Sequence, residues 1–126
     1  MARAFQQYVV YQRAHAAALA VYRETERFPR TEVFGLTSQM RRSAYSVPMN
    51  IAEGSAFEPR EFRRFLAIAL GSATELEYQL ILAEDLGYMN PSTSADLQAQ
   101  VNEIKKMLVV FRQRLNEQSH SPEARS

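Results

Sequence analysis

Apolar residues recur along almost the whole chain at intervals of three and four, the spacing that stacks side chains on one side of an α-helix. Prolines and glycines are few, and four of the five prolines separate long stretches without helix breakers. No segment alternates apolar and polar residues between turn residues, as a strand would. The pattern predicts an all-α fold with helices at residues 5–27, 35–54 and 59–86 and a fourth from about 93 to 118.

The second predicted helix carries two stripes at helical spacing. The apolar stripe consists of Leu36, Met40, Ala44, Val47 and Ile51, and a polar stripe beside it consists of Gln39, Arg42, Ser46, Asn50 and Glu53. Ser and Asn cost up to ~0.7 kcal/mol each in a helix relative to Ala. A buried hydrogen-bond network that links this helix to a neighbour would offset that cost. The alternative is an ordinary solvated face.

Two residues are expected to shape the second helix. Pro48 removes the hydrogen bond to the Ala44 carbonyl, which costs ~3 kcal/mol in a regular helix. We therefore expect helix 2 to be kinked at Pro48. Gly54 can adopt the left-handed conformation that ends helices, and the helix is expected to stop there.

The first helix has more apolar surface than one bundle partner needs. One stripe contains Tyr8, Tyr11, His15, Ala18 and Tyr22, widened by Val10, Ala14 and Val21, with Val9, Ala16 and Ala20 further round. A second interface would use this surplus; the alternative is a helix that tolerates surface alanines. In the following connection we expect Phe28 and Phe34 to anchor the chain to the bundle end.

The third helix completes the expected polar network. Its predicted buried side contains Phe62, Phe65, Leu66, Ala69, Ala73, Leu76, Leu80 and Ala83. Gly71 and Ser72 interrupt this side, which predicts close approach by another helix. Glu75 and Gln79 lie one turn apart at its edge, and we expect Glu75 to pair with Arg42 or Arg41. The predicted buried network comprises Gln39, Arg42, Ser46, Asn50, Glu53, Glu75 and Gln79.

The fourth helix has a heptad seam suited to near-parallel packing of long helices. We expect Thr93 or Ser94 to cap its start. The seam contains Leu97, Val101, Ile104, Leu108, Phe111 and Leu115, and Met107 and Val110 broaden it, which again suggests contact outside the bundle. The polar residues 119–126 are expected to form a disordered tail after a single domain at 1–118.

Basic residues gather at the start of the third helix and on the fourth. The candidates for nucleic-acid contact are Arg60, Arg63, Arg64, Lys105, Lys106, Arg112 and Arg114. Arginines in the first turns of a helix oppose its dipole, so a phosphate backbone could be their target. Salt bridges to neighbouring helices or subunits are the alternative and the preferred interpretation. The net charge of the chain is only +1.

The residues that most enzyme and metal sites require are missing or scattered. The chain has no cysteine, which excludes disulfides and thiolate sites. Its two histidines, His15 and His120, have no ligand partners at helical spacing, and neither a Glu-x-x-His pair nor a glycine-rich phosphate loop occurs. We expect no metal, no cofactor and no small-molecule substrate. Without a long uninterrupted apolar run or a signal segment, we expect a cytoplasmic protein that does not contact the membrane.

Three runs carry a family resemblance: GLTSQ at 35–39, SVPMNIAEG at 46–54 and GSATELEYQL at 71–80. From residue 5 through the fourth helix, the chain resembles the small proteins encoded in intervening sequences of bacterial 23S ribosomal RNA genes. The resemblance implies an antiparallel up-down four-helix bundle that forms a homo-oligomer, as a pentameric ring, without enzymatic activity. More distant relatives are strongly basic, nucleic-acid-binding accessory proteins of reverse transcriptases in diversity-generating retroelements.

Three functions follow as hypotheses. The first is a non-enzymatic assembly module in which the surplus apolar faces of helices one and four close a ring, assisting an RNA or nucleoprotein partner. The second is a nucleic-acid-binding accessory protein, whose basic residues repeat around the ring and bind RNA or meet a nucleic-acid enzyme. The third and weakest is an enzyme that uses Glu53, Glu75 or His15.

Overall fold

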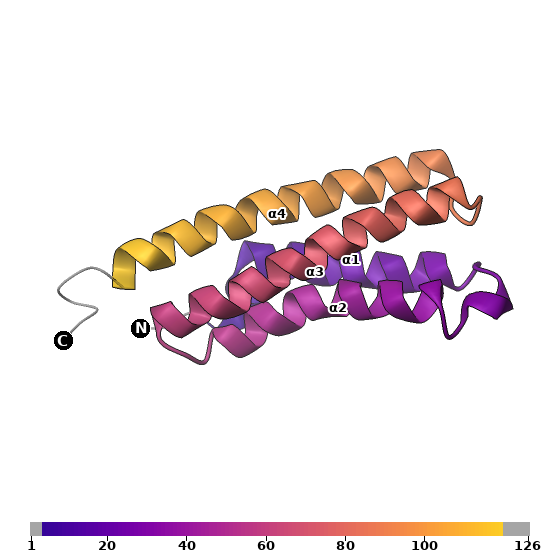
Figure 1. The fold of residues 1–126 in the computed structure, drawn as a ribbon. Helices are drawn as coiled ribbons and strands as arrows, with labels where there is room; N and C mark the ends of the chain where they lie inside the picture. Colours follow the sequence, from indigo (N-terminus) through magenta and orange to yellow (C-terminus); the bar gives the residue numbers. More distant parts are fainter. Residues whose placement is uncertain (1–3, 120–126) are drawn as a thin grey trace.

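The computed structural model describes residues 4–119 and contains four long helices over that range (Figure 1). They are α1 (Val9–Thr25), α2 (Leu36–Gly54), α3 (Pro59–Asp85) and α4 (Pro91–Ser119), with short 3₁₀ turns η1 (Phe5–Gln7) and η2 (Arg30–Glu32). Each helix contacts its two neighbours in the order α1, α2, α3, α4 and back to α1. The predicted all-α, up-down four-helix bundle is confirmed.

Local hydrogen bonds account for the end of α3 and the start of α4, and the start of α4 differs from the prediction. Gly87 has a φ of 78°, and its N–H donates to the Glu84 carbonyl at 2.9 Å, which closes the end of α3. α4 begins at Pro91, earlier than predicted, because the Asn90 side chain accepts a hydrogen bond from the Ser92 N–H at 2.8 Å. The cap is therefore Asn90 rather than Thr93 or Ser94, and proline suits the first helical position.

The core runs the length of the bundle, and most predicted stripes lie in it. The predicted apolar faces of α2, α3 and α4 are buried except for Leu36, Phe65 and Phe111, which are half-buried. On α1 the prediction was partly wrong: Val10, Ala14, Ala17, Ala18 and Val21 face the core, whereas His15 and Tyr22 are exposed. The side chains at the centre of the α1 core face are thus small, because three of these five residues are alanines.

Gly54 has a different role from the predicted one. Within residues 4–119 the positive-φ residue is Gly87, so Gly54 does not end α2 in a left-handed conformation. Instead, a Cβ on Gly54 would lie 2.7 Å from both Phe62 Cδ1 and Phe65 Cβ. Glycine is thus needed for close packing of α3 on α2. The α2 helix continues through Pro48, and the bend expected there stays a prediction.

Gly71 and Phe34 also depart from expectation. Gly71 is exposed, and a Cβ built on it would meet no atom within 4 Å, so the predicted close approach does not occur at Gly71; at Ser72 the hydroxyl lies 2.9 Å from that of Ser46 on α2. Phe28 is buried against Tyr88, with ring centroids 5.5 Å apart, but Phe34 is 94% exposed and anchors nothing. The predicted tail lies outside the described residues except for Ser119, which ends α4.

One described helix, α3, is long and apolar enough to cross a membrane by length and composition, with a mean hydropathy of 1.2 over 18 residues. Core helices of water-soluble proteins pass the same test. α3 supplies Phe62, Leu66, Leu76 and Leu80 to the core and contacts both α2 and α4. A third of that apolar window is buried within the chain, and Ile68, Tyr78 and Ile81 of α3 remain exposed.

Candidate interaction surfaces

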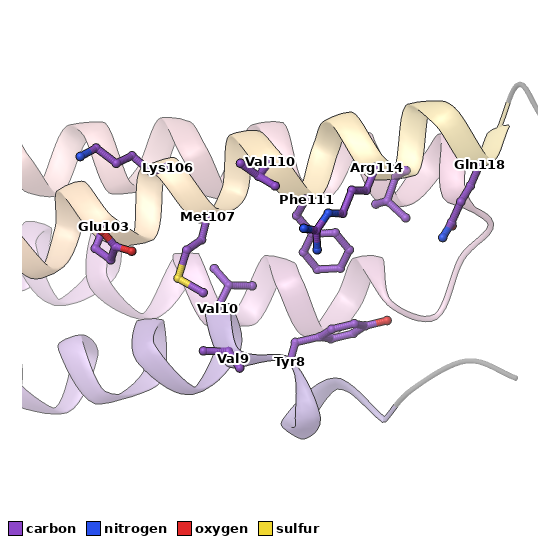
Figure 2. A pocket seen from close by; sticks show the side chains of 11 residues that line it. Tyr8, Val9, Val10, Glu103, Lys106, Met107, Val110, Phe111, Arg114 and Gln118 are labelled. Carbon is purple, nitrogen blue, oxygen red and sulfur yellow. The ribbon is translucent and has the colours of Figure 1, made fainter.

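A cleft lies between α1 and α4 at the end of the bundle where α1 begins (Figure 2). It has a volume of about 500 Å³ and is lined by Tyr8, Val9, Val10, Glu103, Lys106, Met107, Val110, Phe111, Arg114, Leu115 and Gln118. At one end the ring of Tyr8 lies 5.0 Å from that of Phe111, centroid to centroid. We call this surface the α1–α4 cleft.

The two helices that flank the cleft differ in length. α1 has 17 residues and α4 has 29, or roughly 26 Å against 44 Å at ~1.5 Å per residue. Apolar side chains remain in water on both walls: Val9 is 50% exposed and Val110 is 44% exposed. These are the surplus apolar residues that the sequence predicted for the first and fourth helices.

Two cations lie on the rim of this apolar cleft. Lys106 and Arg114 are both exposed, and neither forms an ion pair with any of residues 4–119. They lie four residues to either side of Val110, on one face of α4. Glu103 also lines the cleft. The surface therefore combines apolar side chains with two positive charges and one carboxylate.

The seam between α2 and α3 holds a short polar network. The Ser43 hydroxyl donates to Glu75, and the Ser46 and Ser72 hydroxyls lie 2.9 Å apart. Asn50 Nδ2 donates to the Ser46 carbonyl at 2.8 Å and to the Ser46 hydroxyl at 3.0 Å. The Ser43–Glu75 and Ser46–Ser72 contacts link the two helices at successive turns, whereas the Asn50 bonds lie within α2 and orient Ser46.

The predicted network is wrong in several members. Gln39, Arg42 and Glu53 are exposed in the single chain, and Glu75 is exposed but accepts the hydrogen bond from Ser43. Asn50 and Gln79 are buried and Ser46 is half-buried, as a network requires. The Gln79 Oε1 has no hydrogen-bond partner in the described chain.

The partner predicted for Glu75 was also wrong. Arg41 turns toward α1, where its Nε donates to the Thr25 hydroxyl at 2.8 Å and its guanidinium lies 4.8 Å from the centroid of the Tyr22 ring. Glu75 accepts instead from Ser43, one position from the predicted stripe. The sequence analysis did not include Ser43 or Ser72 in the polar network. The feature that could have indicated them is a small hydroxyl residue beside the apolar face of the helix.

Four of the seven candidate nucleic-acid-binding residues are engaged within the chain. Arg63 Nε donates to the Arg112 carbonyl at 3.1 Å, and Arg112 Nε donates to the Arg63 carbonyl at 3.2 Å. Arg64 pairs with Glu61 at 2.6 Å, and Lys105 pairs with Glu77 at 3.3 Å. The remaining three, Arg60, Lys106 and Arg114, are exposed. Lys105 thus forms the expected kind of salt bridge to a neighbouring helix, Arg63 and Arg112 bond to carbonyls between α3 and α4, and Arg64 pairs within α3.

The residues suggested for chemistry do not gather in one place. His15 is exposed on α1, with its ring stacked on Tyr11 at a centroid distance of 5.9 Å. Glu53 and Glu75 lie on different helices, and neither lines the α1–α4 cleft. Over residues 4–119, no group of three or more histidine, aspartate or glutamate side chains could hold a metal ion.

The comparisons with known proteins agree on one family. The family described as 23S rRNA-intervening sequence protein matches residues 6–110. A solved structure of a protein of unknown function, from the S23 ribosomal protein family of Bacteroides thetaiotaomicron, is 26% identical with a TM-score of 0.74. The similarity covers 82% of this chain and 98% of that one. Comparison with curated proteins gives no match. On the extent of the family match, the chain belongs to the 23S rRNA-intervening sequence protein family.

Proposed function

We propose that this protein is a non-enzymatic, cytoplasmic scaffold whose copies assemble into a ring, with five subunits as the expected number, and which assists an RNA or nucleoprotein partner. The observation that carries the proposal is the α1–α4 cleft, where apolar side chains on two helices face water beside two cations that form no ion pair within residues 4–119. Contiguous exposed apolar surface of this kind is typical of protein interfaces.

The free energy available at this surface is appreciable. Fully burying a Val, Leu, Met or Phe side chain contributes ~1.5–3 kcal/mol, so the half-exposed Val9 and Val110 would each gain about 1 kcal/mol on being covered. Other apolar side chains remain exposed on α2 and α3, including Met49, Ile68 and Tyr78. A subunit with apolar surface on more than one side can contact two neighbours, as a ring requires.

Light scattering coupled to size-exclusion chromatography tests the proposal. Wild-type protein at micromolar concentration should elute as a single species with a mass that is a multiple of 14.4 kDa. Replacing an apolar residue on each wall of the cleft with a charged one, by Val9→Asp together with Val110→Asp, should shift the mass toward that of the monomer, while the circular dichroism spectrum remains helical. A wild-type monomer from low to high micromolar concentration would overturn the proposal.

Nucleic-acid binding is the second candidate, supported by the exposed cations Arg60, Lys106 and Arg114. Several weak basic sites on one rigid assembly can act together. If this function holds, structured RNA should bind in a fluorescence-anisotropy titration, with an affinity that falls steeply as salt increases. The variant Arg60→Ala/Arg114→Ala should lower the salt slope, whereas Arg13→Ala is the control. Absence of binding at low salt would rule this candidate out.

A further inference from the structure

The outer edge of α2 carries a second exposed apolar surface, separate from the α1–α4 cleft. Tyr45, Met49, Glu53 and Phe57 recur every four residues, the first three on one face of α2 and the last in the turn after it. Met49 is 43% exposed and Phe57 is 53% exposed. We call these four residues the α2 ridge. One carboxylate lies between apolar side chains, and it forms no ion pair within residues 4–119.

The ridge and the cleft have complementary patterns. Along α4, the cleft presents Lys106, Val110 and Arg114 at intervals of four: cation, apolar residue, cation, with Glu103 one turn before Lys106. The ridge presents Met49 and Glu53 four apart on α2, then Phe57 in the turn after the helix, where its ring stacks on Phe65 of α3 at a centroid distance of 5.4 Å: apolar residue, anion, apolar residue. Rows of side chains four apart pack into each other when helices cross. With Glu53 opposite Val110, the carboxylate would lie within one turn of both cations.

The two surfaces are placed on the protomer so that they can meet between copies but not within one. The α2–α3 connection and the last turns of α4 lie at the same end of the bundle (Figure 1). α2 and α4 are diagonal in the bundle and do not contact each other. A contact between the ridge of one copy and the cleft of the next is therefore head-to-tail, and repetition of such a contact closes a ring or extends a filament.

We infer that the α2 ridge of one copy occupies the α1–α4 cleft of a second copy, with the Glu53 carboxylate paired to Lys106 and Arg114. Met49 and Phe57 then cover the apolar floor formed by Val9 and Met107. The long stems of Lys106 and Arg114 can lie along this apolar surface while their charged ends reach the carboxylate. The inference rests on the proposed function, because it specifies which surfaces would join the subunits.

A charge-reversal series tests the pairing. Glu53→Lys alone, and Lys106→Glu/Arg114→Glu alone, should each raise the concentration at which the assembly dissociates by about tenfold or more. Combining all three substitutions in one chain should restore the wild-type mass, since the charges are again opposite. Asp85→Lys, a charge reversal at an exposed position outside both surfaces, is the control and should leave the mass unchanged. Circular dichroism checks that every variant is folded.

A mixing experiment tests the head-to-tail geometry. A ridge variant, Met49→Ser/Phe57→Ser, and a cleft variant, Val9→Asp/Val110→Asp, should each be monomeric. Mixed in equal amounts, they should form a 1:1 dimer and nothing larger, because one intact ridge and one intact cleft remain. No dimer on mixing, or a full assembly formed by either variant alone, would overturn the inference.

The outcomes separate the two proposals. A monomeric wild-type protein would overturn both the proposed scaffold function and the ridge-to-cleft contact. A wild-type assembly that Glu53→Lys does not weaken, or that the triple variant does not restore, leaves the scaffold standing and overturns this contact alone.

Discussion

The packing of α3 on α2 at Gly54 gives a sharp test of the fold. Replacing Gly54 with alanine adds one methyl group at a buried position. That Cβ would lie 2.7 Å from Phe62 Cδ1 and from Phe65 Cβ, whereas carbon atoms in ordinary contact lie about 3.5–4.0 Å apart. The ring of Phe62 can rotate, but the Phe65 Cβ is fixed to the α3 backbone. Lengthening this contact therefore requires α2 and α3 to move apart.

The net effect is the difference between two opposing contributions. Overpacking of this size costs ~1–3 kcal/mol, and alanine gains at most ~1 kcal/mol over glycine in a helix. Because Gly54 is the last residue of α2, the propensity gain is small there. We expect Gly54→Ala to lower the free energy of unfolding by about 1–2 kcal/mol, or Tm by roughly 4–8 °C.

Gly71 supplies the matched control. It lies inside α3 with no atom near the position of an added Cβ, so Gly71→Ala should raise stability by about 0.8–1 kcal/mol. Urea denaturation followed by circular dichroism, at one protein concentration for all variants, measures both changes. Equal stability for the two variants, or a gain for Gly54→Ala, would refute the close packing described here.

Three further predictions concern the ends of the bundle and α1. The pKa of Tyr88 is raised above its ordinary value of 10.0, first by its hydrogen bond to Glu32 at 2.9 Å. The stability that protonated Tyr88 contributes is therefore full below pH 10 and is lost as pH rises through the raised pKa. In an absorbance titration, one of the six tyrosines should ionise last, and Glu32→Gln should abolish that lag; simultaneous ionisation in the wild type would contradict this. Asn90→Ala should lower the free energy of unfolding by about 1 kcal/mol, measured in urea, while Thr93→Ala costs less; the reverse order would reinstate the cap predicted from sequence. Arg41→Lys loses the planar contact with Tyr22 and should cost about 0.5–1 kcal/mol by the same assay, with the exposed Arg42→Lys near zero as its control.

Much of the fold could be predicted from sequence because apolar spacing depends on local geometry alone. The stripe from Met40 to Ile51 and the seam from Leu97 to Leu115, apart from the half-buried Phe111, are buried as predicted, since a period near 3.6 fixes which side chains share a face. On α1 the spacing of the apolar residues was less informative. Alanines and aromatic residues occur on several sides of that helix, and hydrophobicity alone could not say that the alanines would face the core.

The polar details could not be predicted, because they depend on how two helices are rotated against each other. A rotation of one residue position decides whether Arg42 or Ser43 faces Glu75, and spacing within α2 does not contain that information. The same limit applies to glycine. The different roles of Gly54 and Gly71 are set by what lies across the helix interface: phenylalanines for the former and water for the latter.

The solution mass of the unmodified protein tests the central claim most directly. Size-exclusion chromatography with light scattering should give an assembly, and the expected ring of five would have five times 14.4 kDa, about 72 kDa. A single 14.4 kDa species throughout the micromolar range would contradict the account, because the cleft and the ridge would then remain uncovered in solution.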